Sequence, residues 1–74
     1  MSKVTLLDLR GTPCPINFIR SKLQLEKMKP GELLEIWLDA GEPIEQVPNS
    51  LSTEGYNIEG IEERDGFFAV CVRA

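Results

Sequence analysis

Patterns of hydrophobic and polar residues divide the chain into six predicted elements. In residues 32–39, the hydrophobic Leu34, Ile36 and Leu38 recur at every second position, which is the period of a half-buried strand. Residues 15–29 contain no glycine and no internal proline, and they are rich in helix-forming residues. The complete set of predicted elements comprises strands over residues 4–9, 32–39, 56–64 and 67–73 and helices over residues 15–29 and 42–54.

Glycine and proline residues mark where these elements end or change direction. Gly55 follows the second helix and is expected to terminate it as a C-cap. Gly60 weakens the third strand, and a bulge there would bring Ile58 and Ile61 onto one face. Pro48 leaves two alternatives, because it either kinks the second helix or marks the start of the longer helix after a short turn.

The order of the elements, β-α-β-α-β-β, predicts a two-layer α/β sandwich. A right-handed crossover makes the first two strands parallel, and Asp65 and Gly66 form the tight turn of an antiparallel hairpin. Both helices then lie on one face of a mixed four-stranded sheet. A chain of 74 residues has room for one such unit, so residues 1–74 are expected to form a single domain.

The predicted fold leaves the other face of the sheet without helices. If the second and fourth strands are neighbours, this face carries a hydrophobic patch made of Trp37, Phe67, Ala69 and Cys71. Such a patch on a small protein is often an interaction surface, which suggests weak self-association or contact with a neighbouring domain. The alternative is that Glu35, Arg73 and other long side chains shield Trp37.

The first helix carries two hydrophobic stripes at about 100° per residue. One consists of Phe18, Leu25 and Met28, and the other consists of Ile16, Ile19 and Leu23. The first stripe is expected to face the core. The second either widens the contact with the core or stays exposed as a docking surface.

Charge is divided unevenly along the chain. The formal net charge of the chain is −4. Residues 1–31, whose basic residues include Lys3, have a net charge of +4, and residues 32–74 have a net charge of −8. The basic residues of the first helix, such as Arg20 and Lys22, either form a solvated surface or create a local positive field. The acidic balance of the whole chain argues against direct binding of nucleic acid.

The sequence contains no histidine and only two cysteines, Cys14 and Cys71. This excludes Ser-His-Asp triads, histidine-ligated metals, four-cysteine zinc sites and C-x-x-C redox pairs, so we expect no metal and no cofactor. Cys71 is predicted to lie at the opposite edge of the sheet from Cys14, which disfavours a disulfide. The start of the chain has no signal-peptide pattern and no apolar run is long. We therefore expect a cytoplasmic protein with free thiols and no membrane contact.

Cys14 is the strongest candidate for chemistry. It lies between Pro13 and Pro15, after a predicted strand and before the first helix. Unpaired N–H groups and the positive end of the helix dipole at this position favour a thiolate, and Arg10 would add to the effect. The carboxyl end of a first parallel strand is also where α/β folds place their sites. The alternative is a buried, inert cysteine that only fills space.

Residues 8–15, which read Asp-Leu-Arg-Gly-Thr-Pro-Cys-Pro, resemble the signature of the TusA/SirA-like sulfur-carrier family, Asp-x-x-Gly-x-x-Cys-Pro-x-Pro. The resemblance extends over essentially the whole chain, and the βαβαββ fold of that family agrees with the predicted order. The residues expected to support Cys14 are Asp8, Arg10, Gly11, Pro13, Pro15 and Asn17. Asn17 stands where the family has its second proline, so the turn is expected to be less rigid and open to local hydrogen bonds.

The resemblance implies a sulfurtransferase-like sulfur carrier. Cys14 would accept sulfane sulfur as a persulfide from a cysteine desulfurase or a rhodanese, and would pass it to an acceptor protein in tRNA thiolation, molybdenum-cofactor synthesis or related sulfur metabolism. Partners are expected on the face formed by Ile16, Ile19, Arg20, Lys22 and Leu23. The competing hypothesis is a non-enzymatic interaction or thiol-sensing module that transfers no sulfur.

Overall fold

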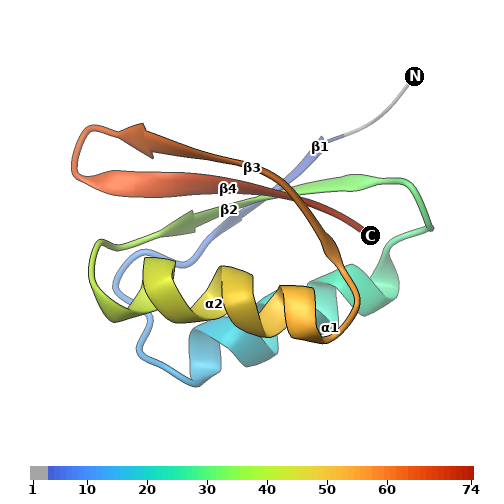
Figure 1. Ribbon diagram of the computed structural model, residues 1–74, viewed down its shortest axis with the longest axis horizontal. Coiled ribbons are helices and arrows are strands. Elements are labelled where there is room, and N and C mark those ends of the chain that lie inside the picture. Colours follow the sequence, from blue (N-terminus) through green and yellow to red (C-terminus); the bar gives the residue numbers. More distant parts are fainter. Residues whose placement is uncertain (1–3) are drawn as a thin grey trace.

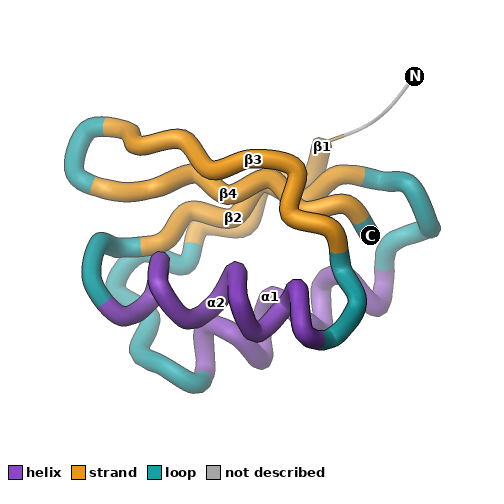
Figure 2. The backbone as a smooth tube through the Cα atoms, in the orientation of Figure 1, coloured by secondary structure: helices purple, strands orange, loops and turns teal. Residues whose placement is uncertain are grey.

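The computed structural model describes residues 4–74, in which two helices cover one face of a four-stranded sheet (Figures 1 and 2). The elements are β1 (Val4–Asp8), α1 (Ile16–Lys27), β2 (Leu33–Leu38), α2 (Glu42–Thr53), β3 (Asn57–Arg64) and β4 (Phe67–Arg73). This confirms the predicted two-layer α/β fold. Each predicted element is present, and its ends differ from the prediction by at most two residues.

The strands are arranged in the order β1-β2-β4-β3. β1 and β2 are parallel, whereas β4 runs antiparallel to both β2 and β3. The predicted bulge is confirmed, because the register between β3 and β4 shifts between Ile58 and Gly60. As a result Ile58 lies opposite Val72 and Ile61 lies opposite Val70, so both isoleucines belong to the strand face that carries the buried valines.

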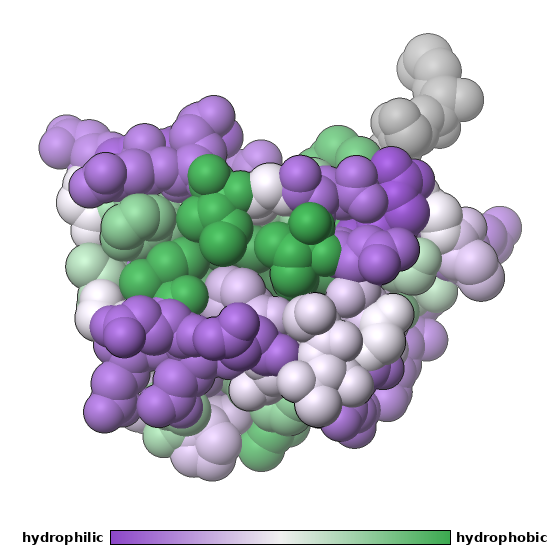
Figure 3. All heavy atoms as spheres, in the orientation of Figure 1, coloured by the Kyte–Doolittle hydropathy of each residue, from purple (hydrophilic) through white to green (hydrophobic). Residues whose placement is uncertain are grey.

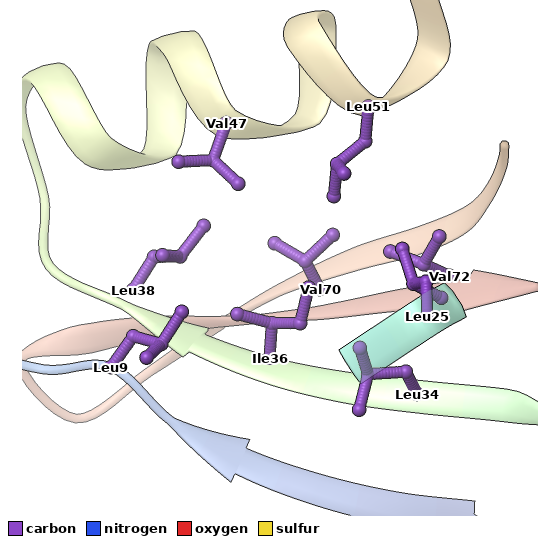
Figure 4. Packing of buried hydrophobic residues seen from close by; sticks show 9 residues of the cluster. All are labelled: Leu9, Leu25, Leu34, Ile36, Leu38, Val47, Leu51, Val70 and Val72. Atoms are coloured by element: carbon purple, nitrogen blue, oxygen red, sulfur yellow. The ribbon is translucent and has the colours of Figure 1, made fainter. Parts of the chain in front are cut away.

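The core lies between the sheet and the two helices, and Figure 4 shows Val47 and Leu51 pointing from α2 toward the sheet. Alternate residues of β2 and β4 point back at them, which is the expected period of a half-buried strand. Each fully buried side chain of this size contributes about 1.5–3 kcal/mol to the free energy of unfolding. The buried cluster consists of Leu9, Leu25, Leu34, Ile36, Leu38, Val47, Leu51, Val70 and Val72.

α2 runs without interruption from Glu42 to Thr53, so it does not start at Pro48. Gly55 ends it as predicted, with a φ angle of 101°. The N–H of Gly55 donates to the carbonyl of Ser52 at 3.0 Å, and the N–H of Tyr56 donates to that of Leu51 at 3.1 Å, which is the Schellman arrangement. Among residues 4–74, no helix has the length and apolar character that crossing a membrane requires.

The helix-free face of the sheet carries the predicted aromatic patch. β2 and β4 are neighbours, and the ring centroids of Trp37 and Phe67 are 4.9 Å apart. The Trp37 Nε1–H donates to Glu35 at 2.7 Å, and Arg10 covers both rings. Trp37 is therefore shielded by Glu35, as one alternative expected, and by Arg10, whereas Arg73 pairs with Glu59. Weak self-association through this face stays a prediction.

A second hydrophobic surface runs between β3 and α2, where Figure 3 shows a hydrophobic band with polar side chains above and below it. The hydrophobic residues of these two elements that keep exposed area include Ile44, Ile58 and Ile61. Ile61 is 52% exposed, and it lies on β3, an edge strand of the sheet.

Candidate functional site

Cys14 lies exposed in the loop that joins β1 to α1. β1 and β2 end on the side of the molecule where α1 and α2 begin (Figure 1). The loop is fastened to β2, because the N–H of Leu9 donates to the carbonyl of Trp37 at 3.0 Å and the N–H of Gly11 donates to the Asp39 carboxylate at 2.6 Å. Gly11 has a φ angle of 79°, which a residue without a side chain adopts at little cost.

Asp8 and Arg10 form a paired clamp next to this loop. The guanidinium group donates to both carboxylate oxygens of Asp8, at 2.9 and 2.8 Å, and the Arg10 N–H donates at 3.1 Å. These hydrogen bonds lower the pKa of Asp8 to about 2. The same guanidinium lies 4.6 Å from the centre of the Trp37 ring and 4.7 Å from that of Phe67. Arg10 therefore secures the loop to the sheet, and its side chain is directed to Asp8 and the aromatic rings.

Three backbone N–H groups at the N-terminus of α1 have acceptors. Pro15 is the N-cap residue, one position before the expected first turn. The N–H groups of Asn17 and Ile19 donate to the carbonyls of Pro13 and Pro15, at 3.1 and 3.0 Å. The N–H of Phe18 donates to the side-chain oxygen of Asn17 at 2.7 Å. The expectation of unpaired N–H groups around the thiol is therefore wrong for these three residues, because the loop and Asn17 supply the acceptors.

The Cys14 sulfur instead contacts α2. Its Sγ–H donates to Oε1 of Gln46 across 3.5 Å. Gln46 lies 32 residues further along the chain, and sequence reasoning missed it. No local pattern marks it, because its proximity to Cys14 depends on how α2 packs beside α1.

Asn17 is fully buried, in line with Ser21 and Leu25 on the core side of α1. Its oxygen caps the N–H of Phe18, so the predicted local hydrogen bond is present. Its Nδ2 group finds no partner among residues 4–74. A buried amide donor without a partner is destabilising, so the unpaired Nδ2 group partly offsets the hydrogen bond that the Asn17 oxygen accepts.

The second hydrophobic stripe of α1 is exposed. Ile16, Ile19 and Leu23 are 49%, 47% and 51% exposed, respectively. The core contact of α1 is formed by Leu25, with Phe18 and Met28 packed around it. Of the two alternatives for this stripe, the structure thus shows the exposed one, in the first two turns of the helix that follows Cys14.

The two basic residues on this helix differ in their surroundings. Lys22 Nζ lies 2.8 Å from a carboxylate oxygen of Glu54, and this contact raises the pKa of Lys22. The ion pair joins α1 to the end of α2 and partly offsets the lysine charge. Arg20 is exposed and forms no ion pair within residues 4–74, so it contributes a free positive charge to this face. Lys3, another basic residue of the N-terminal half, lies outside the described residues.

Cys71 is separate from this site. It is a free, half-buried thiol on the helix-free face of the sheet, where it lines a shallow hollow with Glu35, Arg64 and Ala69. Burial raises the pKa of Cys71, and the carboxylates of Glu59 and Glu35 raise it further. Among residues 4–74, no group of three or more acidic or cysteine side chains is placed to hold a metal ion.

Comparisons with known proteins agree with this architecture. The family described as Sulfurtransferase TusA matches residues 5–74. A protein of Archaeoglobus fulgidus, named as a candidate sulfur carrier, is 41% identical over 58 residues, which cover 78% of this chain and 66% of that protein. A Thermotoga maritima protein with the same description is 40% identical over 57 residues, which cover 77% of this chain and 72% of that protein.

Among solved structures, the SirA-like protein of Desulfitobacterium hafniense superimposes with a TM-score of 0.80 at 25% sequence identity and covers 97% of both chains. The two-layer fold and the family match thus agree over almost the full length of the chain. This chain is a member of the TusA family.

Proposed function

We propose that this chain is a sulfur carrier that accepts sulfane sulfur as a persulfide on Cys14 and relays it to an acceptor protein. The observation that carries the proposal is the exposed Cys14 thiol, placed directly before the exposed hydrophobic stripe of α1 in a chain of the TusA family. Relatives of this chain are named as candidate sulfur carriers, which supports the same role.

The chemistry requires only thiolate attack on sulfur. The Cys14 thiolate attacks the outer sulfur of a donor persulfide, R–S–SH. The bond between the two donor sulfurs breaks, the donor leaves as the thiolate R–S⁻, and Cys14 becomes Cys14–S–SH. An acceptor thiolate then attacks the outer sulfur of this persulfide, which restores the Cys14 thiolate. Neither step has a net redox change, and neither needs a metal or a general base once the attacking thiol is ionised.

The partners are a sulfur donor and a sulfur acceptor, each presenting a cysteine to the same exposed thiol. The donor is a cysteine desulfurase or a rhodanese, and the acceptor serves tRNA thiolation, molybdenum-cofactor synthesis or related sulfur metabolism. Both contact the face formed by Ile16, Ile19, Arg20, Lys22 and Leu23. The transfer takes place in the cytoplasm, where thiols stay reduced.

Intact-mass spectrometry after incubation with a cysteine desulfurase and cysteine tests the proposal. The wild-type chain and Cys71→Ser should gain about 32 Da, the mass of one sulfur atom, and Cys14→Ser should gain nothing. The loaded chain should then lose this mass when a thiol acceptor is added. Loading that persists in Cys14→Ser would overturn the assignment of Cys14.

The competing hypothesis of an interaction or thiol-sensing module predicts a different result. In that case neither cysteine gains sulfur from the desulfurase, although Cys14 still reacts with small oxidants. A chain that is oxidised by peroxide but never takes up sulfur would therefore replace the sulfur-carrier proposal.

A further inference from the structure

We propose that Gln46 is the hydrogen-bonding partner of the reacting sulfur, and that its side-chain amide serves both the protonated and the ionised form of Cys14. This inference rests on the proposed function, because it concerns the sulfur that is thought to carry the persulfide. It starts from the contact in which the Cys14 thiol donates to Oε1 of Gln46 across 3.5 Å.

A glutamine amide suits this position because it carries an acceptor and two donors at its tip. In the structure the Cys14 sulfur faces the amide oxygen, which is the arrangement in which a thiol donates. When the thiol ionises, a half-turn of the amide exchanges the oxygen for the NH₂ group, which can then donate to the anion. Hydrogen bonds to an ionised group are stronger than those between neutral groups, so the amide favours the ionised sulfur.

Several of the neighbouring donors already have acceptors. The N–H groups of Asn17, Phe18 and Ile19 have acceptors within the loop and α1. The Arg10 guanidinium is bonded to Asp8. Gln46 is the side chain that contacts the Cys14 sulfur among residues 4–74, and its hydrogen bond would add to the field of the α1 dipole.

The backbone that carries Gln46 is held in place, whereas its side chain is exposed. Val47, the next residue, is 1% exposed and packs in the core. The Lys22–Glu54 ion pair fixes the far end of α2 to α1. The amide can therefore rotate while its distance from Cys14 is maintained.

The carboxylates near Cys14 explain why a neutral residue at position 46 favours the ionised thiol. The first turn of α2 already contains two carboxylates, and a third opposite the sulfur would repel a thiolate. The charged groups on β1, α1, α2 and the loops that precede the two helices are Asp8, Arg10, Arg20, Lys22, Glu26, Lys27, Asp39, Glu42 and Glu45.

The test compares the alkylation rate of Cys14 in three variants, all in a Cys71→Ser background. Gln46→Met keeps the side-chain length and removes donor and acceptor, and Gln46→Glu replaces the donor by a negative charge. Ser52→Glu is the matched control, because it adds the same charge at an exposed position near the other end of α2. Iodoacetamide labelling is followed by mass spectrometry near neutral pH and at about pH 10, where thiols are ionised.

Near neutral pH, Gln46→Met should react about twofold to fivefold more slowly than the parent, and Gln46→Glu more slowly still. Ser52→Glu should match the parent. At about pH 10 the difference between Gln46→Met and the parent should close, because thiols in general are ionised at that pH. Equal rates near neutral pH, or a deficit that persists at high pH, would overturn the inference.

This experiment is independent of the proposed function because alkylation needs no sulfur donor. A chain that takes up no persulfide would overturn the sulfur-carrier proposal while the alkylation comparison still decided the role of Gln46. Circular dichroism of each variant shows whether α2 is intact, so that a folding defect is not mistaken for a chemical one.

Discussion

The guanidinium group of Arg10 lies 4.6 Å from the centre of the Trp37 ring, and two side-chain hydrogen bonds to Asp8 hold it there. This relationship connects the loop that carries Cys14 to the helix-free face of the sheet. The only tryptophan of the chain therefore reports on the state of that loop.

Substitution of Arg10 should change the environment of Trp37. In Arg10→Ala the ring loses its cover, so the emission of Trp37 should shift to longer wavelength and acrylamide should quench it more strongly. Arg10→Lys keeps the positive charge but loses the two-pronged contact with Asp8. Its emission spectrum is therefore expected to lie between those of the wild type and Arg10→Ala. Arg73→Ala is the control, because Arg73 pairs with Glu59. A spectrum unchanged in Arg10→Ala would contradict the stacked arrangement.

The pairing of Asp8 with Arg10 should make the free energy of unfolding depend on pH in the acidic range. The pKa of Asp8 falls from its ordinary value of 3.8 to about 2 in the folded chain. A carboxyl with a lowered pKa stabilises the folded state where it is ionised, so its contribution is present above about pH 4 and is lost as the pH falls toward 2. Urea unfolding between these values should show a steeper loss for the wild type than for Asp8→Asn. If the wild type and Asp8→Asn lost the same free energy of unfolding over this pH range, the hydrogen bonds between Arg10 and Asp8 would not contribute to stability.

Cys71 should react more slowly than Cys14. Burial and the nearby carboxylates of Glu59 and Glu35 raise the pKa of Cys71, so few molecules carry its thiolate near neutral pH. In Cys14→Ser, labelling of Cys71 should be slow near neutral pH and should accelerate at high pH. The measurement is the rate of mass gain with iodoacetamide, with Cys71→Ser as the comparison. Faster labelling of Cys71 than of Cys14 would contradict the expected effect of burial on the Cys71 thiol.

Charge reversal on the exposed face of α1 should slow sulfur transfer. Arg20→Glu reverses the free charge, and Lys22→Glu also breaks the ion pair with Glu54. We expect a loss of about tenfold in transfer rate for the double variant at low salt, and added salt should slow the wild type in the same direction. Lys27→Glu, at the last residue of α1, is the matched control. Transfer rates that are the same in all variants would remove the electrostatic contribution.

Proline at position 17 should be nearly neutral for stability. Asn17→Pro removes the hydrogen bond to Pro13 and the side-chain acceptor of the Phe18 N–H. It also removes the buried amide that lacks a partner. Position 17 is in the first turn of α1, where a missing N–H is tolerated. The free energy of unfolding should change by no more than about 1 kcal/mol. Ser21→Pro, one turn further on, should cost about 3 kcal/mol or more, and urea unfolding of both variants provides the comparison.

Local patterns were sufficient to predict the elements and the placement of Cys14. The alternation of Leu34, Ile36 and Leu38 depends on backbone geometry alone, and the bulge at Gly60 follows from the missing side chain. The exposure of Ile16, Ile19 and Leu23 was left open, because helical spacing separates two stripes but does not say which one meets the sheet. Packing of α1 decides this.

The contacts that the sequence did not reveal are those between distant segments. Arg10 was expected to act on the thiol, but its direction depends on the position of Trp37, which pairs into β2 far along the chain. The N–H groups around the thiol were expected to be free, yet those of Asn17, Phe18 and Ile19 have acceptors in Pro13, in the Asn17 side chain and in Pro15. The Cys14–Gln46 contact and the Lys22–Glu54 ion pair join α1 and α2, and neither has a signature within either segment.

The exposed stripe of α1 begins two residues after Cys14, so in the proposed sulfur relay a partner seated over the stripe also occupies the neighbourhood of the thiol. Donor and acceptor must then take turns, and the chain has to leave the first before it meets the second. Long residence on either partner would halt delivery, so dissociation sets the upper limit on throughput. A small contact area, with one free charge and three partly exposed hydrophobic side chains, suits a protein whose work depends on brief encounters.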